Sequence, residues 1–306
     1  MTNASRLKGL VAATHTPMHA DGALNLDVVP QIVEHLIGSG ISALYVAGST
    51  GEGMSLTAAE RREVARAYVS AAGGRLPVVV QVGSNSLAES CELAADAQRI
   101  GADVVSANAP SYFKIHSAGA LVEAMGQIAA AAPDLPFYYY HIPRFTGAEI
   151  DMVEFLDRAG QAIDNLAGLK YSDFKVHEYQ ACLAADDGRF DILWGLDEML
   201  LSALAVGAGG AVGSTYNVAA PLYRRIIDAF EAGNLPTARQ WQLRSVELVR
   251  VLVARSLHPS LKAAMGMLGI DVGPCRLPLG RLDDGRKASL RADLEAIGFF
   301  EWASAG

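Results

Sequence analysis

Short apolar runs, rich in β-branched and aromatic residues, alternate with longer Ala- and Leu-rich stretches along most of this chain. Such alternation is typical of βα units, in which each strand joins a parallel sheet and the following helix covers it. Two of the longer stretches are predicted as helices, Thr57–Ala72 with an N-terminal capping box to Glu60 and Ser86–Ile100. The predicted strands are Leu10–Thr14, Ala43–Ala47, Pro77–Val82, Asp103–Ala107, Phe137–Tyr140, Leu166–Lys170, Asp191–Trp194 and Gly210–Val212.

The number of these units favours a closed barrel over an open sheet. An open doubly wound sheet has fewer strands and usually carries a nucleotide fingerprint, whose order of glycines is missing from Gly207–Gly213. We therefore predict an α/β TIM (β/α)8 barrel over residues 1–232. Residues 233–306 are predicted to form a C-terminal helical extension, with helices near Pro236–Arg255, Pro259–Leu268 and Lys287–Ile297.

Composition and charge narrow the class of protein. The formal net charge is -8, and no run of basic residues exists, which argues against nucleic-acid binding. Cys91, Cys182 and Cys275 are too widely spaced for a disulfide framework or a zinc site. Met1–Gly9 lacks the apolar core of a signal sequence. The cysteines fit a reducing compartment best, so we expect a cytoplasmic protein. The uncharged stretch Met199–Tyr223 contains several glycines and a proline, and we interpret it as a buried helix, a strand and a loop rather than a membrane span.

Lys170 differs from the other five lysines because it alone ends an apolar strand. The active site of a TIM barrel lies at the carboxyl ends of its strands. The two-residue repeat of a strand predicts that Leu166, Gly168 and Lys170 share one face. A lysine that points into the barrel mouth loses part of its hydration, which favours the neutral, nucleophilic amine. The alternative is a lysine whose ammonium group extends to the solvated rim.

Other strand ends supply polar groups for the same pocket. Tyr140 ends the neighbouring strand, about 5 Å away, where its phenol can shuttle protons. The loop Gly48-Ser-Thr-Gly-Glu-Gly53 offers two hydroxyls and successive N–H groups that suit a carboxylate or a phosphate, although it lacks the lysine of a Walker loop. The vicinal carboxylates Asp197 and Glu198 suit the hydroxyls of a polyol, with helix capping by Asp197 as the competing interpretation.

A metal site is not expected from this sequence. His15, His116 and His141 are candidates for the same mouth, but no histidine pair has the spacing of metal ligands on a helix.

Four motifs together resemble the N-acetylneuraminate lyase and dihydrodipicolinate synthase superfamily of pyruvate-dependent class I aldolases. They are Gly48-Ser-Thr-Gly-Glu52, Tyr140-His-Ile-Pro143, Gly168-Leu-Lys170 and Gly213-Ser-Thr-Tyr-Asn217. Tyr138-Tyr-Tyr-His-Ile-Pro143, Gly195-Leu-Asp-Glu198 and Gly273-Pro-Cys-Arg-Leu-Pro278 are similar to the N-acetylneuraminate lyases in particular, especially those of animals. The resemblance implies cleavage of N-acetylneuraminate, a sialic acid, to N-acetylmannosamine and pyruvate.

The same resemblance implies a role for each matching residue. Lys170 would form an imine with the C2 keto group, Tyr140 would transfer protons, and Thr50 and Tyr112 would also be catalytic. Ser49 and Thr50 would hold the substrate carboxylate. The residues implied to bind the sugar portion are Ser172, Gly195, Asp197, Glu198, Gly213 and Ser214. The family further implies no metal or organic cofactor, no nucleic-acid or membrane partner, and a homotetramer in which Tyr112 reaches the neighbouring subunit's site.

Other functions stay open at this point. Dihydrodipicolinate synthase carries a substrate-binding arginine five residues after its catalytic tyrosine, where this chain has Phe145, with Arg144 one residue early. This difference weighs against the synthase but leaves a 2-keto-3-deoxy sugar acid aldolase possible. A catalytically silent barrel that binds a sugar acid is an alternative of another class, which the complete set of Lys170, Tyr140, Ser49 and Thr50 disfavours.

Overall fold

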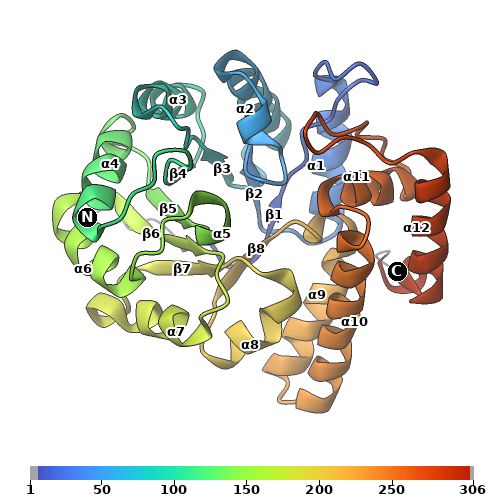
Figure 1. Cartoon of the computed structure of the whole chain (residues 1–306). Helices are drawn as coiled ribbons and strands as arrows, with labels where there is room; N and C mark the ends of the chain where they lie inside the picture. The colour runs from blue at the N-terminus through green and yellow to red at the C-terminus, as the bar shows by residue number, and fades with distance from the viewer. Residues whose placement is uncertain (1–5, 304–306) are drawn as a thin grey trace.

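Each predicted apolar run forms a strand in the computed structural model, which describes residues 6–303. The eight strands are parallel and close into a barrel in chain order (Figure 1). Every observed strand end lies within one residue of its prediction. The strands are β1 Gly9–Ala13, β2 Ala43–Val46, β3 Val78–Gln81, β4 Val104–Asn108, β5 Phe137–His141, β6 Leu166–Tyr171, β7 Asp191–Trp194 and β8 Gly210–Gly213.

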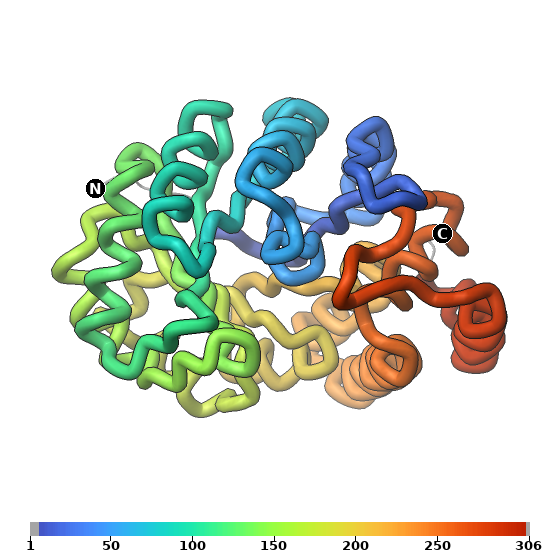
Figure 2. The backbone as a smooth tube through the Cα atoms, turned by 45° about the horizontal axis from the view of Figure 1, so that its top comes forward, coloured from blue at the N-terminus to red at the C-terminus, as the bar shows by residue number. Residues whose placement is uncertain are grey.

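Helices surround the barrel and follow the strands in turn (Figure 2). The predicted capping box is confirmed, because Thr57 and Glu60 exchange side-chain and backbone hydrogen bonds at the start of the second helix. Ser86 likewise caps the third helix. The helices are α1 Val29–Gly38, α2 Ala58–Ala72, α3 Leu87–Arg99, α4 Ala118–Ala130, α5 Pro143–Thr146, α6 Met152–Ala162, α7 Val176–Ala184, α8 Leu200–Ala205 and α9 Tyr216–Glu231.

The C-terminal extension is helical, as predicted. It consists of α10 Leu235–Val253, α11 Leu257–Met267, α12 Asp284–Ala296 and the short, unpredicted α13 Phe299–Trp302. Helix α10 packs along α9, and α11 and α12 lie beside the barrel on the side of α1 (Figures 1 and 2). The division at residue 232 stays a prediction. Within residues 6–303, none of the helices is both long and apolar enough to span a bilayer. The expectation drawn from Met1–Gly9 falls partly outside the described residues.

A bulge in β6 corrects one prediction. Phe137 pairs with Leu166 but Tyr138 pairs with Gly168, so Ala167 is an extra residue on β6. The bulge breaks the two-residue alternation. Leu166 therefore packs outside, between the strands and the helices, whereas Lys170 points into the barrel interior. The prediction that these two residues share a face is wrong.

The prediction for the uncharged stretch Met199–Tyr223 is correct for two of its three elements and wrong for the third. The buried helix and strand are α8 and β8, but the predicted loop is the beginning of α9. The chain has non-helical dihedrals at Ala219, so Pro221 lies near the start of a second helical segment. A proline is tolerated there because its missing N–H has no partner to lose.

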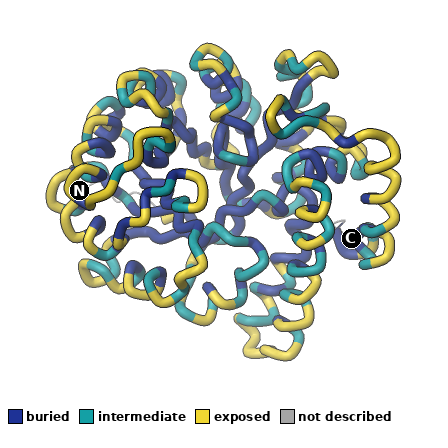
Figure 3. Tube along the Cα trace, viewed as in Figure 1, coloured by how far each residue is buried: buried dark blue, intermediate teal, exposed yellow. Residues whose placement is uncertain are grey.

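The core has two layers, and buried segments concentrate on the strands (Figure 3). The outer layer fills the space between strands and helices. The inner layer fills the barrel with Val11, Tyr45, Val79, Tyr138 and Leu193 among others. The interior of the barrel is therefore a packed core, and the polar groups described next lie at the carboxyl ends of its strands.

Candidate active site at the barrel mouth

Lys170 lies near the end of β6 with its side chain inside the barrel, and only 4% of it is exposed. Its Nζ lies 3.9 Å from the ring centroid of Tyr45 and 4.0 Å from that of Tyr140. No ion pair or hydrogen bond to Nζ is formed by any residue between 6 and 303. Burial lowers the pKa of Lys170 to about 7, although the carboxylate of Asp197 opposes the shift. Much of this amine is therefore neutral, and nucleophilic, at neutral pH.

Tyr140 stands directly beside the lysine, because Tyr140 and Lys170 are paired in the β5–β6 ladder. Its hydroxyl lies 3.4 Å from the Ser49 hydroxyl. Burial raises the pKa of Tyr140, while the hydroxyls of Ser49 and Ser172 act in the opposite direction. The phenol therefore stays protonated at neutral pH. This suits a group that relays protons rather than one that is deprotonated in the resting state.

The loop after β2 brings Ser49 and Thr50 to the same end of the barrel. Thr50 is buried, and Ser49 lines a cavity of about 280 Å³ together with Tyr140, Phe145 and Leu279. A larger depression of about 770 Å³ lies between the segment after β1 and helices α11 and α12. Of the predicted site residues, Ser49 and Tyr140 line the smaller cavity and none lines the larger depression, so the smaller cavity is the one that belongs to the predicted site.

Asp197 is buried at the first position of a 3-10 turn, Asp197–Met199, and does not cap it. Its Oδ2 accepts hydrogen bonds from the N–H of Thr215 at 2.8 Å, from the Thr215 hydroxyl at 2.6 Å and from the Ser214 hydroxyl at 3.4 Å. Burial raises the pKa of Asp197 to about 6, against the bonds from Thr215. Glu198 follows it and is partly exposed. The Asp197 carboxylate therefore connects the loops after β7 and β8, and most of it is ionised at neutral pH.

Ser172, Gly195 and Gly213 form the close-packed side of the mouth. The Ser172 hydroxyl donates to the carbonyl of Gly195 at 3.3 Å. A Cβ on Gly195 would lie 1.9 Å from Ser172 Oγ, and one on Gly213 would lie 2.3 Å from Asp197 Oδ1. Only glycine permits these approaches, which leaves the backbone of both residues next to the polar side chains.

Tyr112 does not join this group in the single chain. It follows β4 in a loop, and its side chain is 78% exposed, with its ring 5.0 Å from that of the exposed Phe113. Its backbone N–H donates to Asn85.

The three histidines of the sequence analysis do not meet. His116 is exposed, and His15 is buried close to Lys262 and His258. His141 lies on the outer side of β5 against the ring of Tyr171, and one of its ring nitrogens is within 4.8 Å of a carboxylate oxygen of Asp173 and of Glu178. Both carboxylates already have partners, since Lys175 lies 3.3 Å from Asp173 and the Tyr171 hydroxyl donates to Glu178. This cluster makes a poor cation site.

Sequence reasoning missed several residues near the mouth. The ring of Tyr45 was identifiable, because Ala43 and Tyr45 alternate on the inner face of β2. The Tyr45 hydroxyl lies 2.9 Å from Ser106 Oγ, which fixes the ring below the lysine. Two further contributors, His258 and the segment around Leu279, come from the C-terminal extension and line the cavity. Gly273–Pro278 resembles a motif of the family, but no local pattern places either contributor at the cavity.

Fold and site together define a (β/α)8 barrel with a buried lysine amine at the carboxyl end of its strands. The chain belongs to the dihydrodipicolinate synthetase family, which it matches over residues 6–297. The family resemblance drawn from the sequence motifs is confirmed.

Within the family, the chain is similar to N-acetylneuraminate lyases from animals and bacteria. It is 41% identical over 302 residues to that of Rattus norvegicus, which covers 97% of this chain and 94% of the rat protein. The structure of the Proteus mirabilis enzyme has a TM-score of 0.94 and 40% identity, covering 96% of this chain and 100% of that one. The enzyme of Aliivibrio salmonicida, also called a sialic acid aldolase, has a TM-score of 0.94 and 41% identity, with coverage of 96% and 98%.

Proposed function

We propose that this chain is a Schiff-base lyase that cleaves N-acetylneuraminate to N-acetylmannosamine and pyruvate. The observation that carries the proposal is Lys170, a buried amine held between two aromatic rings with a pKa of about 7. The similarity to N-acetylneuraminate lyases over nearly the whole chain supports the choice of substrate.

The chemistry follows from the neutral amine. Lys170 Nζ attacks the C2 keto carbon of the open-chain sugar acid, and loss of water leaves a protonated imine. The iminium withdraws electrons from the C3–C4 bond, which breaks as the C4 hydroxyl loses its proton through Tyr140. The products are an aldehyde and an enamine on Lys170. The aldehyde leaves, C3 takes up a proton, and water releases pyruvate. Because the imine itself accepts the electrons, the reaction needs neither a metal nor an organic cofactor.

The remaining residues of the site hold the substrate. Ser49 and Thr50 hold the carboxylate with hydroxyl and backbone N–H donors, and Thr50 belongs to the catalytic group with Tyr140. The ionised Asp197 accepts hydrogen bonds from sugar hydroxyls. The other residues of the sugar site are Ser172, Gly195, Glu198, Gly213 and Ser214.

Phe145 favours the lyase over dihydrodipicolinate synthase. Its side chain lines the cavity at the position where the synthase carries a cationic arginine, whereas Arg144 is exposed and is not among the lining residues. An apolar ring there gives no partner for the second carboxylate that a synthase must bind.

The assembly and location of the protein are part of the proposal. The exposed Tyr112 and Phe113 are suited to a subunit contact, and we expect a cytoplasmic homotetramer in which Tyr112 reaches the neighbouring site and acts as a catalytic residue there. Light scattering of the wild-type chain and of Tyr112→Ala tests the assembly.

A coupled assay for pyruvate tests the substrate. N-acetylneuraminate is expected to be cleaved well above 2-keto-3-deoxy sugar acids, with no condensation of pyruvate and aspartate semialdehyde. Activity that survives in Lys170→Met, or a preference for aspartate semialdehyde, would overturn the proposal.

A further inference from the structure

A buried ion pair connects the loop Gly48–Gly53, which contains Ser49 and Thr50, to the C-terminal extension. Glu52, in that loop, places Oε1 2.6 Å from Nζ of Lys262 on α11, and neither side chain is more than 2% exposed. The other carboxylate oxygen accepts the backbone N–H of Arg276 at 2.8 Å. Lys262 also donates to the carbonyls of Thr16 and Pro274, each at 2.8 Å. Three oxygens therefore surround the ammonium group: two carbonyls that accept its hydrogen bonds and the carboxylate oxygen with which it forms the ion pair.

The pair holds a strained segment of backbone. Ala47 and Glu52, which flank Ser49 and Thr50, both have a φ of 56°. Non-glycine residues adopt this left-handed conformation at a cost and keep it only where the surroundings hold them there. For Glu52, the surroundings are Lys262 and the N–H of Arg276. The positions of the two intervening hydroxyls therefore depend on contacts made by the C-terminal extension.

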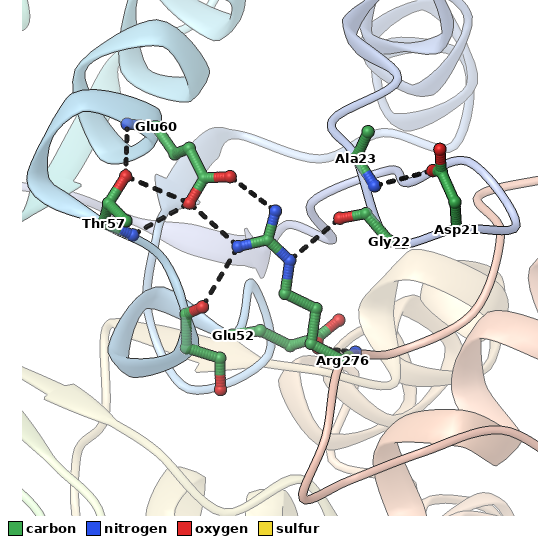
Figure 4. Close-up of polar contacts among 8 residues, drawn as sticks. Asp21, Gly22, Ala23, Glu52, Thr57, Glu60 and Arg276 are labelled. Atoms are coloured by element: carbon green, nitrogen blue, oxygen red, sulfur yellow. Dashed lines mark hydrogen bonds and ion pairs between the residues drawn. The ribbon is translucent and has the colours of Figure 1, made fainter.

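A second set of contacts secures the same segment of the extension (Figure 4). The Arg276 guanidinium donates to the carbonyl of Gly22 at 2.9 Å, to that of Ser55 at 3.2 Å and to the Glu60 carboxylate at 2.8 Å. Ser55 lies just beyond the loop, and Glu60 belongs to the capping box of α2. Pro278 and Leu279, which follow Arg276 closely, line the cavity. The extension thus contacts the loop of Ser49 and Thr50 through Lys262 and Arg276, and it lines the cavity with Pro278 and Leu279.

We propose that the Glu52–Lys262 ion pair is the positioning device for the Ser49 and Thr50 hydroxyls, so that the C-terminal extension contributes to binding of the substrate carboxylate. The inference rests on the proposed function, because it assumes that this loop binds the carboxylate of a 2-oxo acid. Neither Glu52 nor Lys262 touches the reacting atoms. Their loss is expected to weaken carboxylate binding and to leave imine formation at saturation intact.

The test is trapping of pyruvate on Lys170 with borohydride, followed by mass spectrometry across a range of pyruvate concentrations. The decisive variant is the double change Glu52→Gln with Lys262→Met. It removes both charges, leaves no buried charge unpaired, and keeps an acceptor for the N–H of Arg276. We expect near-native thermal stability, full labelling at saturation, and a half-saturating pyruvate concentration raised about tenfold or more. Glu52→Gln alone serves for the same comparison if the double variant does not fold.

Hydroxyacetone, a ketone without a carboxylate, separates positioning from general damage to the pocket. Its half-saturating concentration is expected to stay unchanged in the same variants, whereas a purely structural defect would raise both values together. Lys287→Met, a matched change of an exposed lysine on α12, is expected to alter neither value.

The outcomes distinguish the inference from the proposed function. A folded double variant with wild-type half-saturation for pyruvate overturns the inference alone, as does an equal rise for hydroxyacetone. Failure of wild-type Lys170 to take up any label overturns the proposed function and this inference with it.

Discussion

Two places in the molecule each contain a buried lysine, with opposite surroundings. One is the barrel mouth, with Lys170. The other is the joint between the barrel and its extension, which consists of Glu52, Lys262 and the N–H of Arg276. Lys170 is 4% exposed and Lys262 is 3% exposed. Lys262 meets a carboxylate and two carbonyls, whereas Lys170 meets the faces of two tyrosine rings. Burial alone therefore does not select a nucleophile. The amine becomes reactive where the protein removes water without supplying oxygens in its place.

The comparison also shows how one fold separates two roles. At the mouth, the cost of desolvating an ammonium group favours release of its proton, which leaves a neutral amine. At the joint, the same cost is offset by a carboxylate and two carbonyls, which connect the extension to the barrel.

Loss of activity in Lys170→Met is the largest effect that we expect. Turnover of N-acetylneuraminate should fall by at least about 10⁴-fold, because no other group can form the imine. Lys262→Met should keep measurable turnover at saturating substrate. Steady-state kinetics of the two purified variants make the comparison, and similar losses in both would remove the distinction between the two lysines.

Stability should respond more strongly at the joint. Lys262→Met leaves the Glu52 carboxylate buried without its cation, and breaking a buried pair costs about 3–5 kcal/mol. Urea unfolding measures the change. The exposed pair of Arg75 and Glu34 is the control, since Arg75→Met should cost no more than about 1 kcal/mol. Equal losses for the two variants would contradict the importance of burial.

At the mouth, removal of the lysine should stabilise the fold. The pKa of Lys170 is about 7 in the folded chain and 10.5 for an ordinary lysine, so the unfolded chain binds more protons between these pH values. The penalty for burying the lysine is thus complete below pH 7 and is relieved as the pH rises toward 10.5. Lys170→Met should therefore be more stable than wild type by up to about 4 kcal/mol at pH 6, and by less at pH 9.

Unfolding of Lys170→Met and wild type at the two pH values tests this sign. Lys287→Met serves as the exposed control, with no pH-dependent difference. A stabilisation that grows from pH 6 to pH 9 would contradict the lowered pKa.

The smallest expected effect concerns Asp197. Imine formation at limiting pyruvate should increase through pH 7 in the wild type, as Lys170 loses its proton. Asp197→Asn removes a carboxylate that raises the pKa of Lys170, so the midpoint should move to lower pH by a fraction of a unit. Rates of reductive trapping between pH 5 and 9 give both midpoints, and an unmoved or higher midpoint would show that Asp197 does not act on the lysine.

The features that could be predicted from the sequence are those set by local pattern. Runs of β-branched and aromatic residues predicted every strand end within one residue, and the position of Lys170 at a strand end predicted its place at the barrel mouth. The alternation in β6 failed at Ala167, because a bulge depends on the pairing strand and leaves no mark in a single run. Pro221 suggested a loop, but the change of direction occurs at Ala219.

The joint could not be predicted for a different reason. Glu52 and the N–H of Arg276 are 224 residues apart, and Lys262 lies on a helix with no local signal of its role. Only the closed barrel brings α11 behind the loop of Ser49 and Thr50. Contacts of this kind depend on the whole topology, so a sequence pattern cannot supply them.

Peptide mapping after incubation with pyruvate and borohydride separates the roles of the two buried lysines, because both compete for the same label in one sample. We expect modification of Lys170 and none of Lys262. Label on Lys262, equal label on both, or an unmodified Lys170 would contradict this expectation.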